Sequence, residues 1–593
     1  MNVFALQFDP TVIDWRNPQE FIHWRFSGEV VKSLLPFAGW IATAIFAYMV
    51  ATLFVRTKPT MADLRHAGCF AATVFCGLLL LSLRPGFAAF ATFAMVYCLH
   101  RLSELKFRNV RMNLHAYDFI YFLHNRAAIG FLLENLRSIA IRPLLSLLSC
   151  AILLSLIFFI EPPAIDRLAA AVIFLIAVMA FAVDRRYFAS PRHWSDHWGY
   201  FDRPIHIGYF VDSIFEAFNA WRHGGVLVTE PATAEVPELP PIPAPRLDRL
   251  PPSIILILNE STFPPSLYSP SPPDPAVAAF FQSANGRTHG LRVETFGGAT
   301  WKTEFSVLTG IPASCYGSFG GHVFHWTTNK FHRCLPQYLT LFAYRTAMVY
   351  PLVKEFIGSD KFYNSIGIAE ILDRTILEAT SDRERDEFYF DRALDWLGRH
   401  FSVSDRPVFL YVQTMSNHHP HDVQIIDDRG APTTSMIAGP EFDEYMRRLR
   451  RTCGDYANFR ANLARRFADR EFVIVHFGDH QPPFTLDLLG RKIAWKGTPE
   501  RVPSYEILYR TYFAVDGVNF DPIIDDNLPD TIETAYLSTV ILGAAGIPLD
   551  AVHAVRRDLM IRYTGRLFFA DDDGKIAAQL NRRMMEAGLI SPH

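Results

Sequence analysis

The stretch Ser253-Ile-Ile-Leu-Ile-Leu-Asn-Glu-Ser-Thr262 sets the expected fold of the C-terminal part of this chain. Its run of isoleucine and leucine stops at a carboxylate, Glu260, which predicts a buried strand that ends next to an acid. In open α/β sheets, ligands bind in the crevice outside the carboxyl ends of the strands. A polar cluster at this end of the strand is therefore well placed for chemistry.

The rest of the C-terminal part alternates apolar strands with helical stretches, which is typical of an α/β sheet flanked by helices. We expect strands near 253–259, 346–350, 407–414, 472–477 and 510–515, and helices near 301–309, 384–400, 440–468 and 530–544. No internal repeat interrupts this alternation.

Polar residues follow three later stretches in the same way. Thr300 ends Phe-Gly-Gly-Ala-Thr, His418 lies in Asn-His-His-Pro-His, and Asp479-His480 follow Phe-Val-Ile-Val-His-Phe-Gly. Two carboxylates and an imidazole suit Mn²⁺ or Zn²⁺ better than the all-oxygen cage that Ca²⁺ prefers. We therefore predict a divalent-metal site of Glu260, Asp479 and His480, completed by the Thr300 hydroxyl. Mn²⁺ is the expected ion, with Zn²⁺ and Mg²⁺ as alternatives.

Thr300 has a structural and a functional interpretation. It could simply be the N-cap of the helix predicted at 301–309. At a helix N-terminus beside a metal, its hydroxyl could also lose its proton and attack phosphorus. Gly297-Gly298 would let the backbone approach a phosphoryl group closely.

His418 also has two interpretations. Any one histidine of this imidazole-rich stretch could be an ordinary surface or core residue. A histidine that follows a strand end could instead bind phosphoryl oxygens or protonate a leaving alkoxide.

The first third of the chain is strongly apolar. Charge-poor runs lie at about 34–55, 66–83, 86–99, 143–160 and 168–183. They predict about five transmembrane spans, with four spans, or buried helices of a soluble protein, as the alternatives. The first 32 residues show no short apolar core followed by a cleavage site, so we expect no removable signal peptide.

Two further segments are expected to lie along the membrane surface. Residues 101–142 mix basic, aromatic and apolar side chains, and 184–230 are rich in Trp, Tyr, His and Arg. A proline-rich linker follows at 237–252. The expected organisation is a transmembrane domain with interfacial helices at 1–184, a membrane-surface segment and linker at 185–252, and a catalytic domain at 253–593.

The net charge and the cysteine content exclude few classes of function. The net charge is −3 without a basic stripe, so nucleic acid is not an expected partner. Cys315 and Cys334 could close a disulfide if their domain is exported, or could remain free thiols.

An ordered set of motifs resembles a known family. They are Leu258-Asn-Glu-Ser261, Gly297-Gly-Ala-Thr-x3-Glu-Phe305, Leu335-Pro-Gln-Tyr-Leu339, Asn417-His-x-Pro420 and Gly478-Asp-His480. Together they resemble the lipoteichoic-acid-synthase and phosphoglycerol-transferase branch of the sulfatase/alkaline-phosphatase superfamily. The resemblance covers about 250–545, and Phe107-Arg-Asn-Val-Arg-x6-Asp-Phe119 extends it more weakly into the membrane part.

The resemblance implies a five-span anchor in a bacterial cytoplasmic membrane and an extracytoplasmic α/β catalytic domain. Such a domain moves a head group from a phospholipid, through a phospho-threonine, to a hydroxyl of a glycan or glycolipid. By motif match, Thr300 corresponds to the nucleophile, Glu260, Thr300, Asp479 and His480 to the metal ligands, and His418 to the substrate-binding histidine. Glycerol phosphate from phosphatidylglycerol is the expected group; phosphoethanolamine transfer and hydrolysis by a membrane-anchored phosphodiesterase are the alternatives.

Two departures leave the transferred group open. Where glycerol-phosphate-handling members show a His followed by Phe-Trp-Asn-Arg, this chain has Tyr350 and Phe356-Ile-Gly-Ser359. Phosphoethanolamine-transferring relatives carry more cysteines in the soluble domain than the three found here. Sulfate esters are not expected substrates, because a threonine cannot form the aldehyde that sulfatases need. A non-catalytic scaffold would require the metal cluster to be accidental.

Overall fold

The computed structural model describes most of the chain in two compact units. The described residues are 28–56, 61–110, 112–124, 148–187, 206–223, 226–233, 235–239, 249–268, 274–381, 384–423, 439–489, 505–571 and 574–591. The first unit comprises Met1–Leu105, Leu133–Pro191 and Arg203–Asp212, and the second Lys106–Leu132, Arg192–Asp202 and Ser213–His593. Most of the proline-rich linker and residues 188–205 of the predicted surface segment lie outside the described residues.

Each apolar run of the first third coincides with a helix. These helices are α2 (Gly28–Arg56), α3 (Met61–Ser82), α4 (Pro85–Val110), a helix at Leu148–Ile160 and α7 (Arg167–Tyr187). Among the described residues, two stretches, Leu64–Ser82 and Arg167–Tyr187, are long and apolar enough to cross a membrane. The five-span count therefore remains a prediction, with two candidate spans supported.

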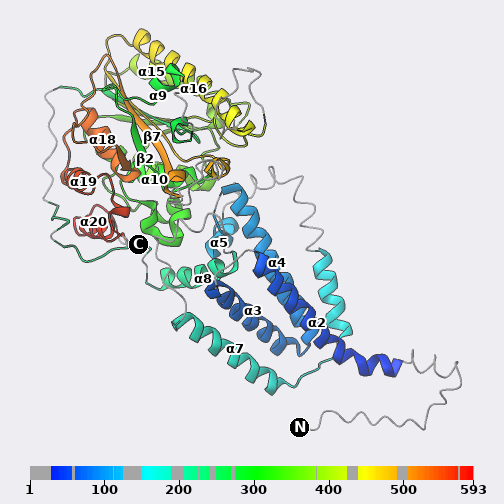
Figure 1. Cartoon of the computed structure of the whole chain (residues 1–593). Helices are drawn as coiled ribbons and strands as arrows, with labels where there is room; N and C mark the ends of the chain where they lie inside the picture. The colour runs from blue at the N-terminus through cyan, green and yellow to red at the C-terminus, as the bar shows by residue number, and fades with distance from the viewer. Residues whose placement is uncertain are drawn as a thin grey trace, which may run out of the picture. The chain divides into compact units, whose positions relative to one another are not determined.

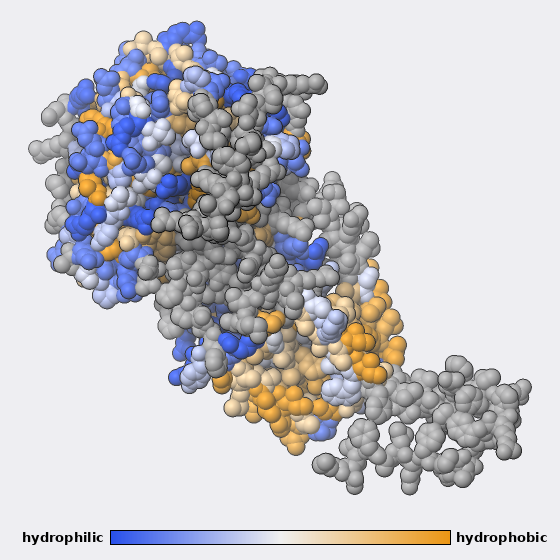
Figure 2. All heavy atoms as spheres, in the orientation of Figure 1, coloured by the Kyte–Doolittle hydropathy of each residue, from blue (hydrophilic) through white to orange (hydrophobic). Residues whose placement is uncertain are grey.

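The surface of these helices is hydrophobic, as Figure 2 shows by its orange colour. Large apolar side chains that face outward include Ile41, Ile45, Leu153, Leu156, Leu175, Ile176 and Met179. A soluble protein would bury such a set, so lipid is the environment that suits these helices.

The second unit is built on one eight-stranded sheet in the order β4-β3-β5-β1-β6-β7-β2-β8 (Figure 1). The strands are β1 (Ser253–Asn259), β2 (His289–Arg292), β3 (Arg345–Val349), β4 (Glu370–Leu372), β5 (Val408–Gln413), β6 (Phe472–Gly478), β7 (Arg510–Val518) and β8 (Thr531–Glu533). β1 lies between β5 and β6 and runs parallel to both. Every residue of β1 is buried, which is why its sequence is a continuous apolar run rather than an alternating one.

Helices cover both faces of the sheet. They are α9 (Pro275–Phe280), α10 (Thr300–Thr309), α11 (Val323–Thr327), α12 (Leu335–Thr340), α13 (Ser359–Ser365), α14 (Arg374–Leu377), α15 (Asp386–Phe401), α16 (Pro440–Arg466), α18 (Leu537–Ala544), α19 (Ala551–Arg562) and α20 (Lys575–Glu586). Leu256 pairs with Tyr411, and the next residue, Ile257, pairs with His476, so these two pairs point to opposite faces. Tyr411 contacts α10 through Glu304, whereas the ring of His476 contacts Tyr456 of α16. α10 and α16 therefore pack on opposite faces.

The expected strands are all present. Four agree within one residue at each end, and β7 runs three residues beyond the expected 515. One expected helix is wrong in its first half. The stretch 530–544 begins as β8 and becomes α18 only at Leu537. Thr531-Ile-Glu533 pairs with β2, itself a four-residue strand that the sequence pattern did not reveal. A short apolar run fits a strand or a helix equally well. Here it forms a strand because it pairs with the free edge of β2.

The second unit also contains a helix from the N-terminal third. α5 (Ala116–His124) packs on the segment 313–327 that follows α10 in the chain. Asp118 of α5 is hydrogen-bonded to His322, and the Tyr117 ring contacts His325 and Trp326.

The two cysteines whose pairing was left open are free thiols, and both are buried. The Cys334 thiol donates instead to Gln337 Oε1 and to the Ile366 carbonyl, at 3.2 and 3.3 Å.

Candidate metal and phosphoryl-transfer site

The sheet register brings the predicted acids together. Asn259, the last residue of β1, pairs with Gly478, the last residue of β6. The residues that follow, Glu260 and Asp479, therefore leave neighbouring strands at the same edge. The crossing is tight, because a Cβ on Gly478 would lie 1.9 Å from the Thr262 carbonyl oxygen. Only glycine fits there.

Glu260, Asp479 and His480 form one buried cluster. One ligand atom from each residue lies within 4.8 Å of the other two. His480 Nε2 is 3.4 Å from Glu260 Oε1 and 3.3 Å from Asp479 Oδ2. All three side chains are at most 4% exposed. Separations of this size leave room for an ion between the three ligand atoms.

The backbone fixes the orientation of the imidazole. His480 Nδ1 is 3.1 Å from the Gln481 carbonyl oxygen, so this nitrogen carries the proton and donates it. Nε2 is the ring nitrogen that faces the carboxylates. A second ring nitrogen bonded to a carbonyl is the usual way in which a protein orients a metal-binding histidine.

The two carboxylates need a cation. Burial, and then the nearby charge of Asp479, raise the pKa of Glu260 well above its usual range. Ser261 donates to both acids, from its N–H to Asp479 Oδ1 and from its hydroxyl to Glu260 Oε1. Asp479 Oδ2 is buried and accepts no hydrogen bond. Carboxylate oxygens and imidazole nitrogens are atoms that a divalent metal binds, so this orphaned oxygen and the nearby His480 Nε2 are consistent with such a site.

Thr300 lies at this cluster, but it is not the N-cap of α10. Ala299, in a left-handed conformation with φ of 61°, is the N-cap of α10, and Thr300 is the first helical residue. Thr300 Oγ1 is 3.3 Å from Glu260 Oε2 and 3.5 Å from His480 Nε2. Thr300 thus comes from a helix N-terminus rather than from a strand end. Gly297 and Gly298, with φ of 70° and 148°, make the sharp turn that presents it.

Two other hydroxyls of α10 are committed to structure. Thr303 donates to the Asp479 carbonyl at 2.8 Å, and Ser306 donates to Glu294 Oε1 at 2.6 Å. Both are fully buried. Thr300, which is only partly buried, is the hydroxyl of this helix that a substrate can reach.

His418 follows β5, the neighbour of β1, so it leaves the sheet at the same edge as Glu260. Its Nδ1 is 2.7 Å from the His419 carbonyl oxygen, and its own carbonyl accepts from Arg448. Asn417 donates to the Thr262 hydroxyl at 3.1 Å and so ties this loop to the end of β1. The role of His418 in binding substrate remains a prediction.

Sequence reasoning missed the residues that support the site. Glu304, one turn after Thr300, accepts from the Tyr363 and Tyr411 hydroxyls at 2.7 and 2.9 Å. Burial raises the pKa of Glu304 to about 7 despite these two bonds. The spacing of four residues from Thr300 was visible, but the tyrosines come from distant parts of the chain. At the positions that depart from the family pattern, the Tyr350 and Ser359 hydroxyls lie 3.1 Å apart.

One family model matches part of this chain. Residues 252–503 match the family described as Sulfatase. The matched segment runs from β1 past β6 and includes Glu260, Thr300, Asp479 and His480.

Individual relatives are distant. An uncharacterized protein of Haemophilus influenzae is 26% identical over 251 residues, which are 39% of this chain and 44% of the relative. The match thus spans less than half of that relative's length.

Similar solved structures include two transferases and one periplasmic domain, each at a TM-score below 0.5. The phosphoglycerol transferase GacH of Streptococcus pyogenes is 15% identical, with a TM-score of 0.45, over 59% of this chain and 89% of that one. The lipooligosaccharide phosphoethanolamine transferase A of Neisseria meningitidis is 12% identical, with a TM-score of 0.46, over 87% of this chain and 95% of that one. The periplasmic domain of EcEptC from Escherichia coli in complex with Zn is 13% identical, with a TM-score of 0.36, over 53% and 87%.

Proposed function

We propose that this protein is a metal-dependent transferase that moves a phosphate-containing head group from a phospholipid to a hydroxyl of an extracytoplasmic glycan or glycolipid. One observation carries the proposal: the Thr300 hydroxyl lies 3.3 Å from Glu260 and 3.5 Å from His480 in a buried two-carboxylate, one-imidazole cluster. This is the arrangement that an activated nucleophile at a metal requires.

The chain's own residues account for the first half of the reaction. A divalent ion held by Glu260, Asp479 and His480 would supply Lewis-acid stabilisation of the phosphoryl oxygens. The Thr300 hydroxyl passes its proton to Glu260 Oε2, its hydrogen-bond partner at 3.3 Å, and its oxygen bonds to phosphorus while the bond from phosphorus to the diacylglycerol oxygen breaks. Glu260 returns this proton when Thr300 is released in the second half. The N-terminus of α10 stabilises negative charge at this place. His418 protonates the leaving alkoxide.

The second half reverses these roles. A hydroxyl of the acceptor loses its proton to His418 and attacks phosphorus, and the bond to Thr300 Oγ breaks. Water in place of the acceptor would give hydrolysis by the same residues. The acceptor therefore decides between a transferase and a phosphodiesterase.

Glycerol phosphate from phosphatidylglycerol is the first group to test, because the motif order matches that branch of the superfamily. Phosphoethanolamine is the second. It is favoured by one observation: Tyr350 and Ser359 face each other at the positions where the glycerol-phosphate pattern has histidine and arginine.

The direct experiment is a mass measurement on the full chain, purified in detergent and incubated with either lipid in mixed micelles. Trapping should add one head-group phosphate to the peptide that contains Thr300, and the added mass identifies the group. Thr300→Ala is the control and should acquire no mass. Diacylglycerol release that requires a glycan acceptor supports transfer, and release without one supports hydrolysis. A protein that holds no stoichiometric metal would instead be a scaffold.

A further inference from the structure

The loop that carries His418 is held by one buried arginine. Arg448 of α16 is 1% exposed and spreads its guanidinium over three carbonyl oxygens of this loop. It donates to the carbonyls of His418 at 2.8 Å, Pro420 at 3.0 Å and Val423 at 2.9 Å. Its Nε donates to Glu444 Oε1 at 2.8 Å, which neutralises the charge. One side chain thus fixes the path of six consecutive residues.

The same face of α16 also fixes the loop after β1. The Tyr445 hydroxyl accepts from the Phe263 N–H at 2.9 Å and donates to the Phe263 carbonyl. Thr452, two turns further along α16, accepts from Asn417 at 3.4 Å. Residues four apart on a helix share a face, so α16 presents Arg448 and Thr452 to the loop after β5 together. The helix sets the spacing between the end of β1, with Glu260, and the loop that carries His418.

The ring of His418 depends on this arrangement. Its Nδ1 is bonded to the His419 carbonyl, so Nε2 is the nitrogen that can serve a substrate. Because the bond partner of the ring is the backbone of its own loop, a shift of the loop redirects Nε2.

We propose that Arg448 is a positioning residue for His418, with Glu444 as its counter-ion. The proposal rests on the proposed function, since it assigns Arg448 an effect on transfer through the substrate-binding role of His418. Arg448 does not touch the metal cluster ligands in any of its hydrogen bonds to the loop and to Glu444 described above. Its effect is therefore expected in turnover rather than in metal content.

Arginine is needed for a geometric reason. A guanidinium offers five N–H donors in a rigid plane, and Arg448 uses this fork to reach carbonyls from three residues at once. A lysine ammonium keeps the charge but cannot span them. Arg448→Lys would leave one or more of these carbonyls without its donor and free the loop to move.

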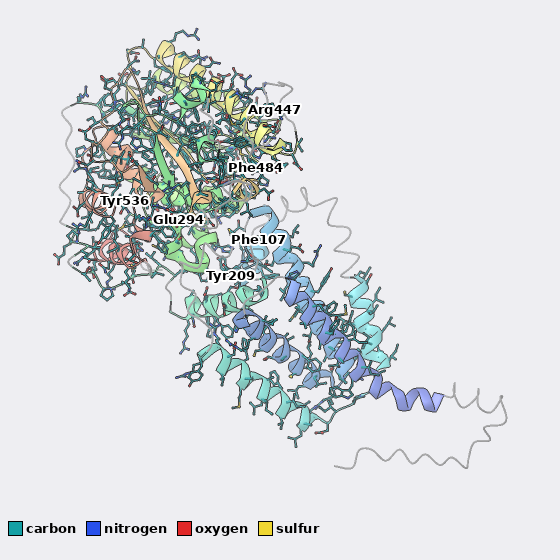
Figure 3. All side chains as sticks on the ribbon, viewed as in Figure 1. Phe107, Tyr209, Glu294, Arg447, Phe484 and Tyr536 are labelled. Carbon is teal, nitrogen blue, oxygen red and sulfur yellow. The ribbon has the colours of Figure 1, made fainter. Side chains whose placement is uncertain are left out.

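The neighbouring residue provides a matched control. Arg447, labelled on α16 in Figure 3, pairs with the other oxygen of the same Glu444 at 2.9 Å. Among the described residues, Arg447 makes its side-chain hydrogen bonds to Glu444 and none to the 418–423 loop. Arg447→Lys therefore makes the same chemical change next to the same acid without removing the support of the loop.

The first test is a double-mutant cycle on the full chain in mixed micelles with phosphatidylglycerol or phosphatidylethanolamine. Arg448→Lys should lower kcat for diacylglycerol release about tenfold or more, with metal content unchanged, whereas Arg447→Lys should stay within about twofold. In a His418→Ala background, Arg448→Lys should cause no further loss, because the residue acts through His418. An additive loss, or equal effects of the two arginine variants, would overturn the proposal.

A second measurement does not depend on turnover. Diethylpyrocarbonate modifies imidazole, and peptide mapping gives its rate at His418. Arg448→Lys should raise this rate several-fold, while Arg447→Lys should leave it unchanged. If the wild type transfers no head group but the rates differ in this way, the proposed function fails and the positioning role stands. If the rates do not differ, the positioning role fails, whatever the activity.

Discussion

At the residue scale, the proposed chemistry depends on Thr300. Thr300→Ala should lower turnover by at least about a thousandfold, because it removes the only group proposed to bond to phosphorus. Metal content should stay near that of the wild type, because three other ligands remain. Thr300→Ser keeps a hydroxyl and should restore part of the rate. Wild-type turnover by the alanine variant would refute the assignment of Thr300 as the nucleophile. Thr303 and Ser306 are not available in its place, because they already donate to Asp479 and Glu294.

The three buried ligands should behave differently from Thr300. Glu260→Gln, Asp479→Asn and His480→Ala should each weaken binding of Mn²⁺ or Zn²⁺ by more than the roughly 10–100-fold that loss of an outer partner costs. Titration of the metal-free protein measures this directly. Glu304→Gln is the control, because it changes a buried carboxylate of α10 outside the cluster. If one of the three variants binds metal like the wild type, the residue replaced in that variant is not a metal ligand.

Glu304 makes a separate prediction about pH. Its carboxyl ionises at a pKa of about 7 in the folded protein, against 4.5 ordinarily, because it is buried. The folded state therefore holds a proton that the unfolded state loses, so this residue's contribution to stability is full below pH 4.5 and is lost as the pH rises through 7. Glu304→Gln can still accept from both tyrosines and should remove this loss. At pH 8 the variant should unfold at a higher temperature than the wild type. Its free energy of unfolding should be larger by on the order of 2–3 kcal/mol.

Equal thermal midpoints of the two proteins at pH 8, with the same fall between pH 5 and 8, would show that Glu304 does not hold the proton. Glu586→Gln, on an exposed helical ion pair with Arg582, controls for removal of a surface acid and should have no measurable effect.

At the element scale, α5 belongs to the catalytic unit through one buried carboxylate. Asp118 pairs with Lys106 at 2.7 Å and with His322 at 2.8 Å, and it also accepts from the His115 N–H at 2.8 Å. Burial alone would raise the pKa of Asp118, but Lys106 and His322 outweigh it and hold this pKa far below its ordinary range. Gly321, which precedes His322 in the chain, accepts a hydrogen bond from the Trp301 indole at 2.9 Å. The docking of α5 is therefore connected to the residue next to Thr300.

Asp118→Asn should destabilise this docking strongly. It keeps the shape but leaves an ammonium and an imidazole without their counter-charge, which typically costs about 3–5 kcal/mol in a buried pair. Limited proteolysis should then cut within 313–327 faster, and turnover should fall with metal still bound. Unchanged proteolysis and turnover would mean that α5 is an accessory to the domain rather than part of its support.

At the scale of the whole molecule, the position of α5 constrains the topology. α5 contacts the segment 313–327, so it lies on the same side of any membrane as the catalytic domain. The chain between them must then cross an even number of times. The helices Leu148–Ile160 and α7 satisfy this parity if both span, although only α7 is long enough by itself. The positive charge of 101–142 disfavours export of this segment under the positive-inside rule. It does not place the segment on a different side of the membrane from the catalytic domain.

We predict that the catalytic domain is extracytoplasmic, because a phospholipid head group and a glycan acceptor meet at the outer face. Periplasmic-active reporters fused after residue 113 and after residue 250 should both be active, and cytoplasm-active reporters at these points should both be inactive. Opposite behaviour of the two sites would refute the parity argument. Cytoplasmic activity at both would refute export, and with it the lipid-to-glycan reaction.

The sequence by itself predicted the five longer strands and the grouping of Glu260, Asp479 and His480, because both follow from local patterns. An apolar run long enough to cross a buried sheet predicts a strand wherever it pairs, and the residue that follows it must lie at the sheet edge. Glu260, Asp479 and His480 could therefore be named before their distances were known. The short strands β2, β4 and β8 could not, since three or four residues carry too little pattern and their conformation depends on the neighbouring edge.

Only the tertiary structure decided which distant side chains support the site. The two tyrosines that hold Glu304 lie 59 and 107 residues from it along the chain. The arginine that holds the His418 loop lies 30 residues from His418, and His322 lies 204 residues from its partner on α5. Such contacts arise because buried polar groups must find partners, and packing rather than spacing along the chain selects which groups are near. The sequence predicted the candidate reacting groups, whereas only the tertiary structure shows which residues hold them in place.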